Sequence, residues 1–275
     1  MKTKKLLLLY IALLIVAIFL MVFLLNLKRP THKEVTLPRD FNNIRESGEL
    51  NVVTDYNSIG YYVSGDSVTG FQYELIKAIE QRWGLKVNLF LENSLDENLN
   101  GLLEGQYDIV ARNIPVNAPL REKFNFTESI GLNKQVLVQR RAEFNDGTEP
   151  IRQHLDLAKK TIYVAENSPV ILRLQNLSHE IGDTIFVEQN ETYEAEQLVM
   201  MVAGGDIDFT VCDEIVAKQL SEKLPEIDIE TAVGFTQLES WAVRKNSPIL
   251  LDSINSFFDN FRSSKEFREM YEKYY

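Results

Sequence analysis

Few side chains in this sequence have the types and the spacing that catalysis or metal binding requires. The three histidines, His32, His154 and His179, lie far apart and do not have the spacing of metal ligands. Cys212 is the one cysteine, which excludes an internal disulfide and a cysteine-based metal cluster. The sequence also lacks a phosphate-binding glycine-rich loop and a recognisable nucleophile–base set. It therefore predicts no cofactor and no metal, and it favours binding over catalysis.

Polar and charged side chains gather instead in four loops that follow predicted strands. These loops are residues 55–70, 112–121, 166–169 and 212–213. In open sheets of parallel strands, ligands bind beyond the carboxyl ends of the strands, so we expect a binding site there. Asp213 follows the last strand of its segment, where a buried carboxylate would need a cation. Alternatively, Asp213 caps a helix expected over residues 214–220.

The elements that would position these loops form a pattern that occurs twice. The first copy is strand 50–54, helix 71–83, strand 86–91, helix 95–103 and strand 107–111, and the second is strand 161–165, helix 170–177, strand 184–188, helix 192–203 and strand 205–211. Gly105 and Gly205 each end a helix and are followed, three residues later, by an aspartate. This order predicts an α/β fold of two similar lobes with mostly parallel sheets, facing each other across a cleft.

Charge is unevenly distributed along the 275 residues, whose formal net charge is −11. Residues 1–29 contain five basic side chains and no acidic one. Removing those five from the 29 basic residues leaves 24 against 40 acidic residues, a balance of −16 for the rest of the chain. So acidic a body would repel nucleic acid and an anionic membrane surface, and neither is expected as a direct ligand.

The N-terminal segment has the composition of a membrane anchor. Residues 6–25 carry no charge, and about 20 apolar residues match the ~30 Å hydrocarbon core of a bilayer. We expect an uncleaved signal anchor over residues 1–29, with a cleaved signal peptide as the alternative. Lysines near the start would hold the N-terminus in the cytoplasm. The protein would then be a single-pass protein of the cell inner membrane, with a polar tether over 30–47 and its body facing the periplasm.

These features together resemble the bacterial extracytoplasmic solute-binding proteins of family 3, and in particular the non-catalytic N-terminal domain of membrane-bound lytic murein transglycosylase F. The resemblance covers about residues 48–275 and rests on an ordered set of short segments. They are Leu50-Asn-Val-Val-Thr54, Gly70-Phe-Gln-Tyr-Glu-Leu75, Gly105-Gln-Tyr-Asp-Ile109, Leu120-Arg-Glu-Lys-Phe-Asn-Phe-Thr127, Lys160-Thr-Ile-Tyr-Val164, Gly205-Asp-Ile-Asp-Phe209 and Trp241-Ala-Val-Arg-Lys245. It implies a type II periplasmic-binding-protein-like fold. Lobe one would be 48–135 plus 241–275, lobe two would be 136–240, and the hinges would lie near 135–140 and 240–244.

The resemblance also implies roles for residues in the cleft. Arg121 matches an arginine that clamps a ligand carboxylate through two charge-assisted bonds; the alternative is a surface arginine paired with Glu122 or Glu128. The segment leading to Arg121 is one residue longer than in the family. Asp213 matches the aspartate that receives a ligand ammonium. Further contacts are expected from Asn167 and Ser168 at a helix start, with plain helix capping as the alternative, and from Arg112 and Asn113. Tyr56, Asn57 and Tyr61 occupy the first loop, where members of the family place an aromatic wall or lid.

The resulting functional hypothesis is an anchored solute-binding protein that closes around an amino acid, a short peptide or a cell-wall-derived peptide, with a permease or a cell-wall enzyme as partner. One alternative is a ligand-sensing regulatory module for a cell-wall enzyme or a signalling partner. Another is a prephenate or arogenate dehydratase-like enzyme, in which Glu166 or Glu239 would be the general acid. The lysozyme-like catalytic domain does not occur in the sequence, so no transglycosylase activity is expected.

Overall fold

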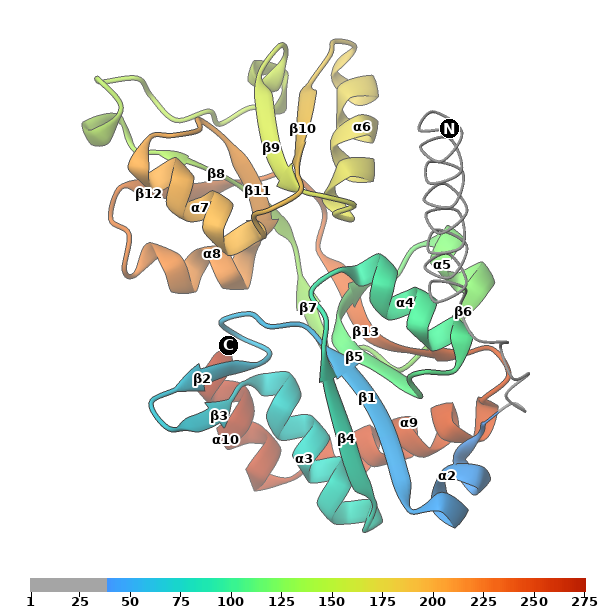
Figure 1. The fold of residues 1–275 in the computed structure, drawn as a ribbon. Coiled ribbons are helices and arrows are strands. Elements are labelled where there is room, and N and C mark those ends of the chain that lie inside the picture. The colour runs from blue at the N-terminus through green and yellow to red at the C-terminus, as the bar shows by residue number, and fades with distance from the viewer. Residues whose placement is uncertain (1–38) are drawn as a thin grey trace, which may run out of the picture. The chain divides into compact units, whose positions relative to one another are not determined.

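The computed structural model describes residues 39–275, which form two α/β lobes, each built on its own sheet (Figure 1). The expected anchor over residues 6–25 lies outside the described residues. Among residues 39–275, no helix combines the length and the apolar character needed to cross a membrane. The predicted two-lobed α/β fold is confirmed by the two sheets.

Lobe one is organised around a sheet with the strand order β4-β1-β5-β13-β6, and β7 also pairs with β13. Its strands are β1 (Glu49–Thr54), β4 (Lys86–Leu91), β5 (Ile109–Pro115), β6 (Phe124–Phe126), β7 (Gly131–Asn133) and β13 (Gln237–Arg244). Its helices are α2 (Phe41–Ser47), α3 (Phe71–Trp83), α4 (Leu95–Glu104), α5 (Ala118–Lys123), α9 (Pro248–Arg262) and α10 (Lys265–Tyr274). A small hairpin, β2 (Tyr62–Ser64) and β3 (Ser67–Thr69), precedes α3.

Lobe two repeats this arrangement with the strand order β10-β9-β11-β8-β12. Its strands are β8 (Gln135–Arg140), β9 (Thr161–Ala165), β10 (Phe186–Asn190), β11 (Thr210–Asp213) and β12 (Ile227–Ala232). Its helices are α6 (Val170–Ile181), α7 (Ala195–Gly204) and α8 (Glu214–Ser221), with short 3-10 helices at Ala142–Phe144 and His154–Leu157. In each sheet the second, first and third strands of the copy are parallel neighbours. The predicted repeat is therefore confirmed.

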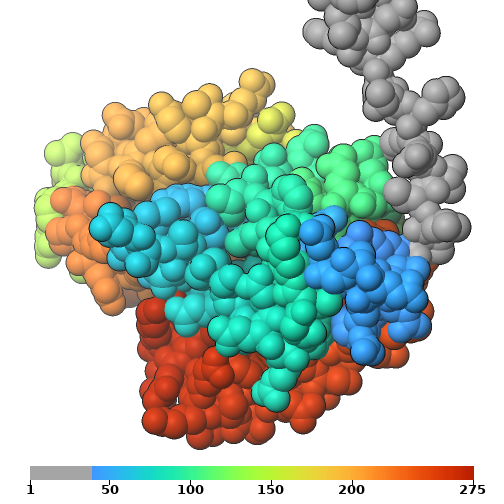
Figure 2. All heavy atoms as spheres, turned by 60° about the horizontal axis from the view of Figure 1, so that its bottom comes forward, coloured from blue at the N-terminus to red at the C-terminus, as the bar shows by residue number. Residues whose placement is uncertain are grey.

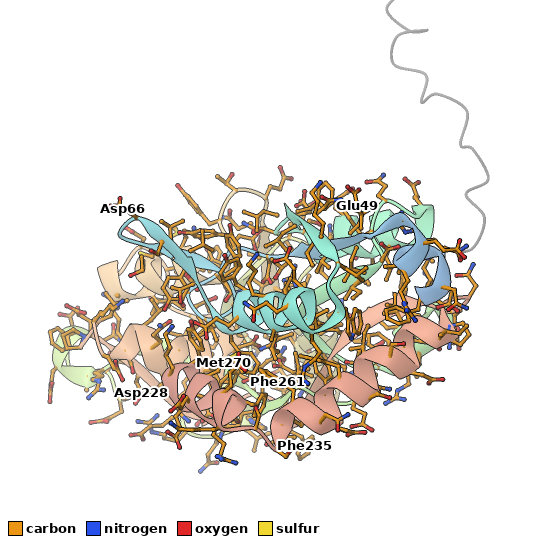
Figure 3. All side chains as sticks on the ribbon, turned by 90° about the horizontal axis from the view of Figure 1, so that it is seen from below. Glu49, Asp66, Asp228, Phe235, Phe261 and Met270 are labelled. Atoms are coloured by element: carbon orange, nitrogen blue, oxygen red, sulfur yellow. The ribbon has the colours of Figure 1, made fainter. Side chains whose placement is uncertain are left out.

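The chain passes between the sheets twice, at Lys134 and over residues 233–236. The segment 135–140, expected as a hinge, is strand β8 of the second sheet, and 240–244 is the end of β13 in the first. Phe235, which is labelled in Figure 3, lies in the second crossing and is 81% exposed.

The expected tether over 30–47 differs from the structure in its last residues, which form α2. Asp40 and Asn43 make a capping box at the start of this helix, and Gly48 ends it in the left-handed conformation. Ile44 is fully buried against the first sheet's core. Residues 41–47 are therefore part of lobe one.

Alternating side chains along the strands divide each lobe into two cores. Val52 packs on the side of α3 and α9, whereas Val53 packs on the side of α4. The C-terminal helices complete the larger core: Phe261 of α9 and Met270 of α10, labelled in Figure 3, are both buried there. In Figure 2 the red C-terminal segment lies against the cyan segment that contains α3. Lobe one thus depends on residues from both ends of the described chain.

The loop that connects β1 to α3 is held down by close backbone contacts. The Phe71 N–H donates to the Ile59 carbonyl at 2.7 Å, and the Tyr73 N–H donates to the Gly60 carbonyl at 3.0 Å. Gly70 has φ of +134°, and a Cβ there would lie 2.3 Å from the Gly60 oxygen. The loop can adopt this path only with glycine at position 70.

We expect Gly70→Ala to destabilise the domain by more than about 3 kcal/mol, because it combines backbone strain with a clash against backbone atoms. Gly65→Ala is the matched control, since Gly65 also has positive φ (+62°) but a Cβ there meets no atom within 4 Å. It should cost only about 1–2 kcal/mol. Urea unfolding of both variants checks this; equal losses would contradict the role of the close approach.

Candidate functional site

A cavity of about 370 Å³ lies between the lobes, at the carboxyl ends of their parallel strands. Loops from all four expected segments line it, including Asp55 after β1, Arg112 in β5, Glu166 after β9 and Asp213 at the end of β11. Its size falls in the range typical of sites for small molecules. The site predicted from strand order is therefore present as a cavity.

The structure brings seven of the nine predicted site residues to this cavity. They are Tyr56, Asn57, Arg112, Asn113, Asn167, Ser168 and Asp213. Tyr61 lies behind this layer, with its ring edge-on to Tyr56 at 6.4 Å between centroids. Arg121 is exposed in the last turn of α5 and does not line the cavity.

The position of Arg121 follows from how α5 begins. The Asn117 side chain caps the helix by accepting the Leu120 N–H at 3.0 Å, and a proline occupies the first turn. This start lies close to the cavity, whereas Arg121 follows one turn later. The structure therefore does not bring Arg121 and Asp213 together, which the expected clamp requires. The alternative pairing with Glu128 is not formed either, because Glu128 pairs with Arg262 at 3.3 Å.

Arg112 is the arginine that lines the cavity, but its guanidinium is already engaged. Its Nη2 lies 3.1 Å from the Asp55 carboxylate, and its Nη1 donates to the Asn93 carbonyl at 2.8 Å. A longer contact of 3.4 Å joins Nη1 to Asn98. These contacts tie β5 to the loops that follow β1 and β4.

Asn57 organises the first loop from within. Its Oδ1 accepts the N–H groups of Ile59 and Gly60 at 2.9 and 2.6 Å, and its Nδ2 donates to Asp55 at 2.9 Å. Tyr56 remains 52% exposed beside it. The loop is thus preorganised, and it presents an aromatic ring at the cavity.

The same loop makes contact across the cleft with lobe two. The Ser58 N–H donates to the Glu196 Oε1 of α7 at 2.7 Å, and the Gln219 amide of α8 donates to the Ser58 carbonyl at 3.3 Å. These two hydrogen bonds hold the lobes together at one edge of the cavity.

The start of α6 offers few donors to an anion. The Asn167 N–H, with φ of +56°, donates to the Gln189 side chain at 3.1 Å, and the Ser168 N–H donates to the Ala165 carbonyl at 3.2 Å. Val170 N–H in turn lies 3.4 Å from the Ser168 hydroxyl. Asn167 and Ser168 thus shape the turn that precedes α6.

Two carboxyl groups, Asp55 and Asp213, line the cavity, and a third, Glu239, is buried next to the lining residue Asn133. Glu239, in β13, is 3% exposed, and its Oε1 accepts the Asn133 amide at 2.9 Å. Within residues 39–275, its Oε2 and the Asp55 Oδ1 are buried without a hydrogen-bond partner. The sequence marked Glu239 only as a possible general acid, and it missed Asp55; the position of Asp55 directly after a buried strand was the available signal.

The electrostatics around these groups favour protonation. Burial, with the nearby Asp213 and Asp55 charges, raises the pKa of Glu239 to about 8, against hydrogen bonding from Asn133. Burial and Asp55 raise the pKa of Asp213 to about 6, although Arg112 opposes this. The Asp213 side chain makes no hydrogen bond that caps α8. Asp213 is thus a carboxylate at the cavity, in need of a positive charge.

The pKa shift of Glu239 predicts a pH-dependent stability. Because the folded-state pKa lies above the ordinary 4.5, stability falls as pH rises from about 4.5 to about 8. Asp213, Asp55, Asn133 and Tyr275 are the groups facing Glu239, and none supplies a positive charge. Glu239→Gln should therefore stabilise the domain at pH 8 by about 1–3 kcal/mol, because it removes a buried charge while keeping the Asn133 bond.

Thermal unfolding of the wild type and of Glu239→Gln at several pH values between 5 and 8 checks this prediction. The two curves should converge toward pH 5 and separate toward pH 8. A constant difference across that range would contradict it.

A known protein family matches the part of the chain that forms the two lobes. The model of the family described as bacterial extracellular solute-binding proteins, family 3, matches residues 50–275. Curated relatives include membrane-bound lytic murein transglycosylase F of Desulfosudis oleivorans, 28% identical over 232 residues that are 84% of this chain and 50% of the relative. The same enzyme of Photobacterium profundum is 28% identical over 86% of this chain and 45% of its own length. The chain thus spans about half the length of these relatives.

Solved structures show a similar fold. A mutant of the arginine-binding protein ArgBP from T. maritima has a TM-score of 0.72 at 22% identity, covering 85% of this chain and 97% of that one. An ancestral arginine-binding protein bound to arginine has a TM-score of 0.72 at 21% identity, covering 83% and 98%. The ancestral amino acid-binding protein AncCDT-1, described as a precursor of cyclohexadienyl dehydratase, scores 0.70 at 21% identity, covering 85% and 98%.

Proposed function

Because the chain belongs to the bacterial extracellular solute-binding proteins, family 3, we propose that residues 39–275 form an extracytoplasmic receptor that closes around a small amine-bearing solute. Amino acids, short peptides and cell-wall-derived peptides are the ligands of this kind. The cavity supports this proposal most directly, because it lies between two lobes that are joined by only two crossings.

Ligand binding would act by shifting a population between open and closed forms. Asp213 belongs to lobe two, whereas Asp55 and Glu239 belong to lobe one. An ammonium group placed between them would interact with both lobes only when these are close. The ligand would therefore stabilise the closed form by its difference in affinity for the two forms.

We further propose that residues 6–25 anchor this receptor in the inner membrane, with the binding domain on the periplasmic side. The relatives named as transglycosylases carry a domain of this family over about half their length. That combination supports a cell-wall enzyme as partner, and hence sensing, alongside delivery to a permease. Genetic co-occurrence with either partner distinguishes the two roles.

Substitutions in the cavity test the binding proposal. Asp213→Asn should weaken the binding of the best ligand by at least about tenfold, because it removes one charge from the ammonium site. Arg121→Ala is the control and should leave the affinity unchanged, since Arg121 is exposed and does not line the cavity. Calorimetry with the full-length chain in lipid nanodiscs measures both, against amino acids and muropeptides. A loss in Arg121→Ala with none in Asp213→Asn would reject the site.

A second candidate function is dehydration of a prephenate-like acid, favoured by the protonated state of Glu239 near neutral pH. Its carboxyl could protonate a leaving hydroxyl, so that water and carbon dioxide leave together and the ring becomes aromatic. The receptor proposal predicts no turnover of prephenate above the buffer background. Turnover that Glu239→Gln abolishes would favour the enzyme, and absorbance of the phenylpyruvate product distinguishes the outcomes.

A further inference from the structure

At the cavity, several hydrogen-bond donors already have partners within the protein, whereas some buried acceptors have none. The main donors expected to grip a carboxylate already have partners in the protein. The Arg112 guanidinium contacts Asp55 and Asn93. At the start of α6, the N–H groups of Asn167 and Ser168 donate to Gln189 and Ala165. A ligand's anionic group would have to compete with Asp55, Asn93, Gln189 and Ala165 for these donors.

Acceptors, by contrast, remain available. Asp55 Oδ1 and Glu239 Oε2 are buried without a partner among the described residues. Glu239 is 3% exposed and lies between two residues that line the cavity: Asn133, to which it is hydrogen-bonded, and Pro115, its neighbour in the sheet. Buried acceptors left unpaired cost about 1–3 kcal/mol each, so these acceptors favour a ligand that only donates.

A second group of carboxylates lies at the mouth of the cavity. Glu194 of lobe two is exposed at the cavity, and its pKa is raised by partial desolvation and by the charges of Asp55 and Glu92 across the cleft, although Arg112 opposes the shift. Glu196 lies beside it and is held by the Ser58 N–H. Like charges from opposite lobes thus face one another, and their repulsion opposes closure until a cation separates them.

The charge of the whole lining agrees with these two groups. Seven acidic side chains line the cavity: Asp55, Glu92, Glu166, Glu191, Glu194, Glu196 and Asp213. Arg112 is the single basic one within the described part of the chain. No group of three or more acidic, histidine or cysteine side chains there is arranged to hold a metal ion. The volume of about 370 Å³ suits an organic molecule.

We propose that the cavity binds an organic dication, with one ammonium or guanidinium group on Asp55 and Asp213, next to the buried Glu239, a second near Glu92 and Glu194, and no clamp for a carboxylate. This inference rests on the proposed function and narrows its ligand class. A basic amino acid meets the requirement through its two cationic ends. A diamine of the same length meets it equally well, because Arg112, the basic residue of the described lining, is already paired with Asp55.

Pairs of ligands that differ only by a carboxylate test this selectivity. Calorimetry on the full-length chain in lipid nanodiscs would compare L-lysine with cadaverine and L-arginine with agmatine, and would include L-glutamine and L-glutamate. We expect each amine to bind within about threefold of its parent amino acid, or more tightly, and glutamate not to bind.

A loss of at least about tenfold on removing the carboxylate would overturn the inference, because it would reveal a carboxylate clamp. Binding of glutamine or glutamate in preference to the cations would overturn it too. In both cases the proposed receptor function would stand. Absence of binding by all six compounds would count against the dication, and the added absence of binding by other amino acids and muropeptides would reject the receptor itself.

Substitution at the mouth tests the second charge. Glu194→Gln should weaken cadaverine by about tenfold and leave pentylamine, which has one ammonium group, within about twofold. Asp66→Asn is the matched control, because this substitution also removes one negative charge. Asp66 is exposed in the turn between β2 and β3 and does not line the cavity. The control substitution should alter neither affinity. Equal losses for the two amines, or no loss for cadaverine, would overturn the assignment of a second cationic position.

Discussion

Each crossing of the chain leads directly into a strand of the sheet that it enters, and these two strands determine where the buried acids lie. β8 enters the second sheet directly after Lys134, and β13 enters the first directly after residues 233–236. Asp213 pairs with Gln135 at the start of β8, and Glu239 pairs with Pro115 near the start of β13. Because of the register in which β8 and β13 pair, both acids lie beside the crossings, where the two lobes meet.

Two carboxyl groups at such a junction are a cost to the folded state unless something neutralises them. The surrounding amides, such as Asn133, provide hydrogen bonds but no charge. Protonation neutralises the two carboxyl groups below the raised pKa values of Glu239 and Asp213, and the proposed cationic ligand would do so above these values. The buried carboxyl groups that lower the stability of the empty domain would thus increase its affinity for a cation. Ionisable groups with strongly shifted pKa values are for this reason common at binding sites.

The architecture could be predicted from the sequence because its signals are local. Helix 71–83 and strand 161–165 have the predicted bounds, since apolar periodicity and a terminating residue such as Gly84 lie within the segment itself. The residues of the site were harder to predict from the sequence. Arg112 lies within β5 and Arg121 in α5, which follows it, and only the three-dimensional path of the chain decides which arginine lines the cavity. Glu239 becomes a neighbour of Asp213 only through pairing of distant strands, which no local pattern encodes.

The last helix of the described chain connects the cleft to a distant surface. Tyr274 Oη accepts the Gly70 N–H at 2.9 Å and lies 2.6 Å from the Thr69 hydroxyl, so α10 braces the base of the loop that carries Tyr56 and Asn57. Tyr275 packs its ring on Phe71 at 4.9 Å between centroids. Motion of that loop on ligand capture must therefore either strain these bonds or carry α10 with it. Any such displacement of α10 would carry the effect of ligand capture to residues that do not line the cavity.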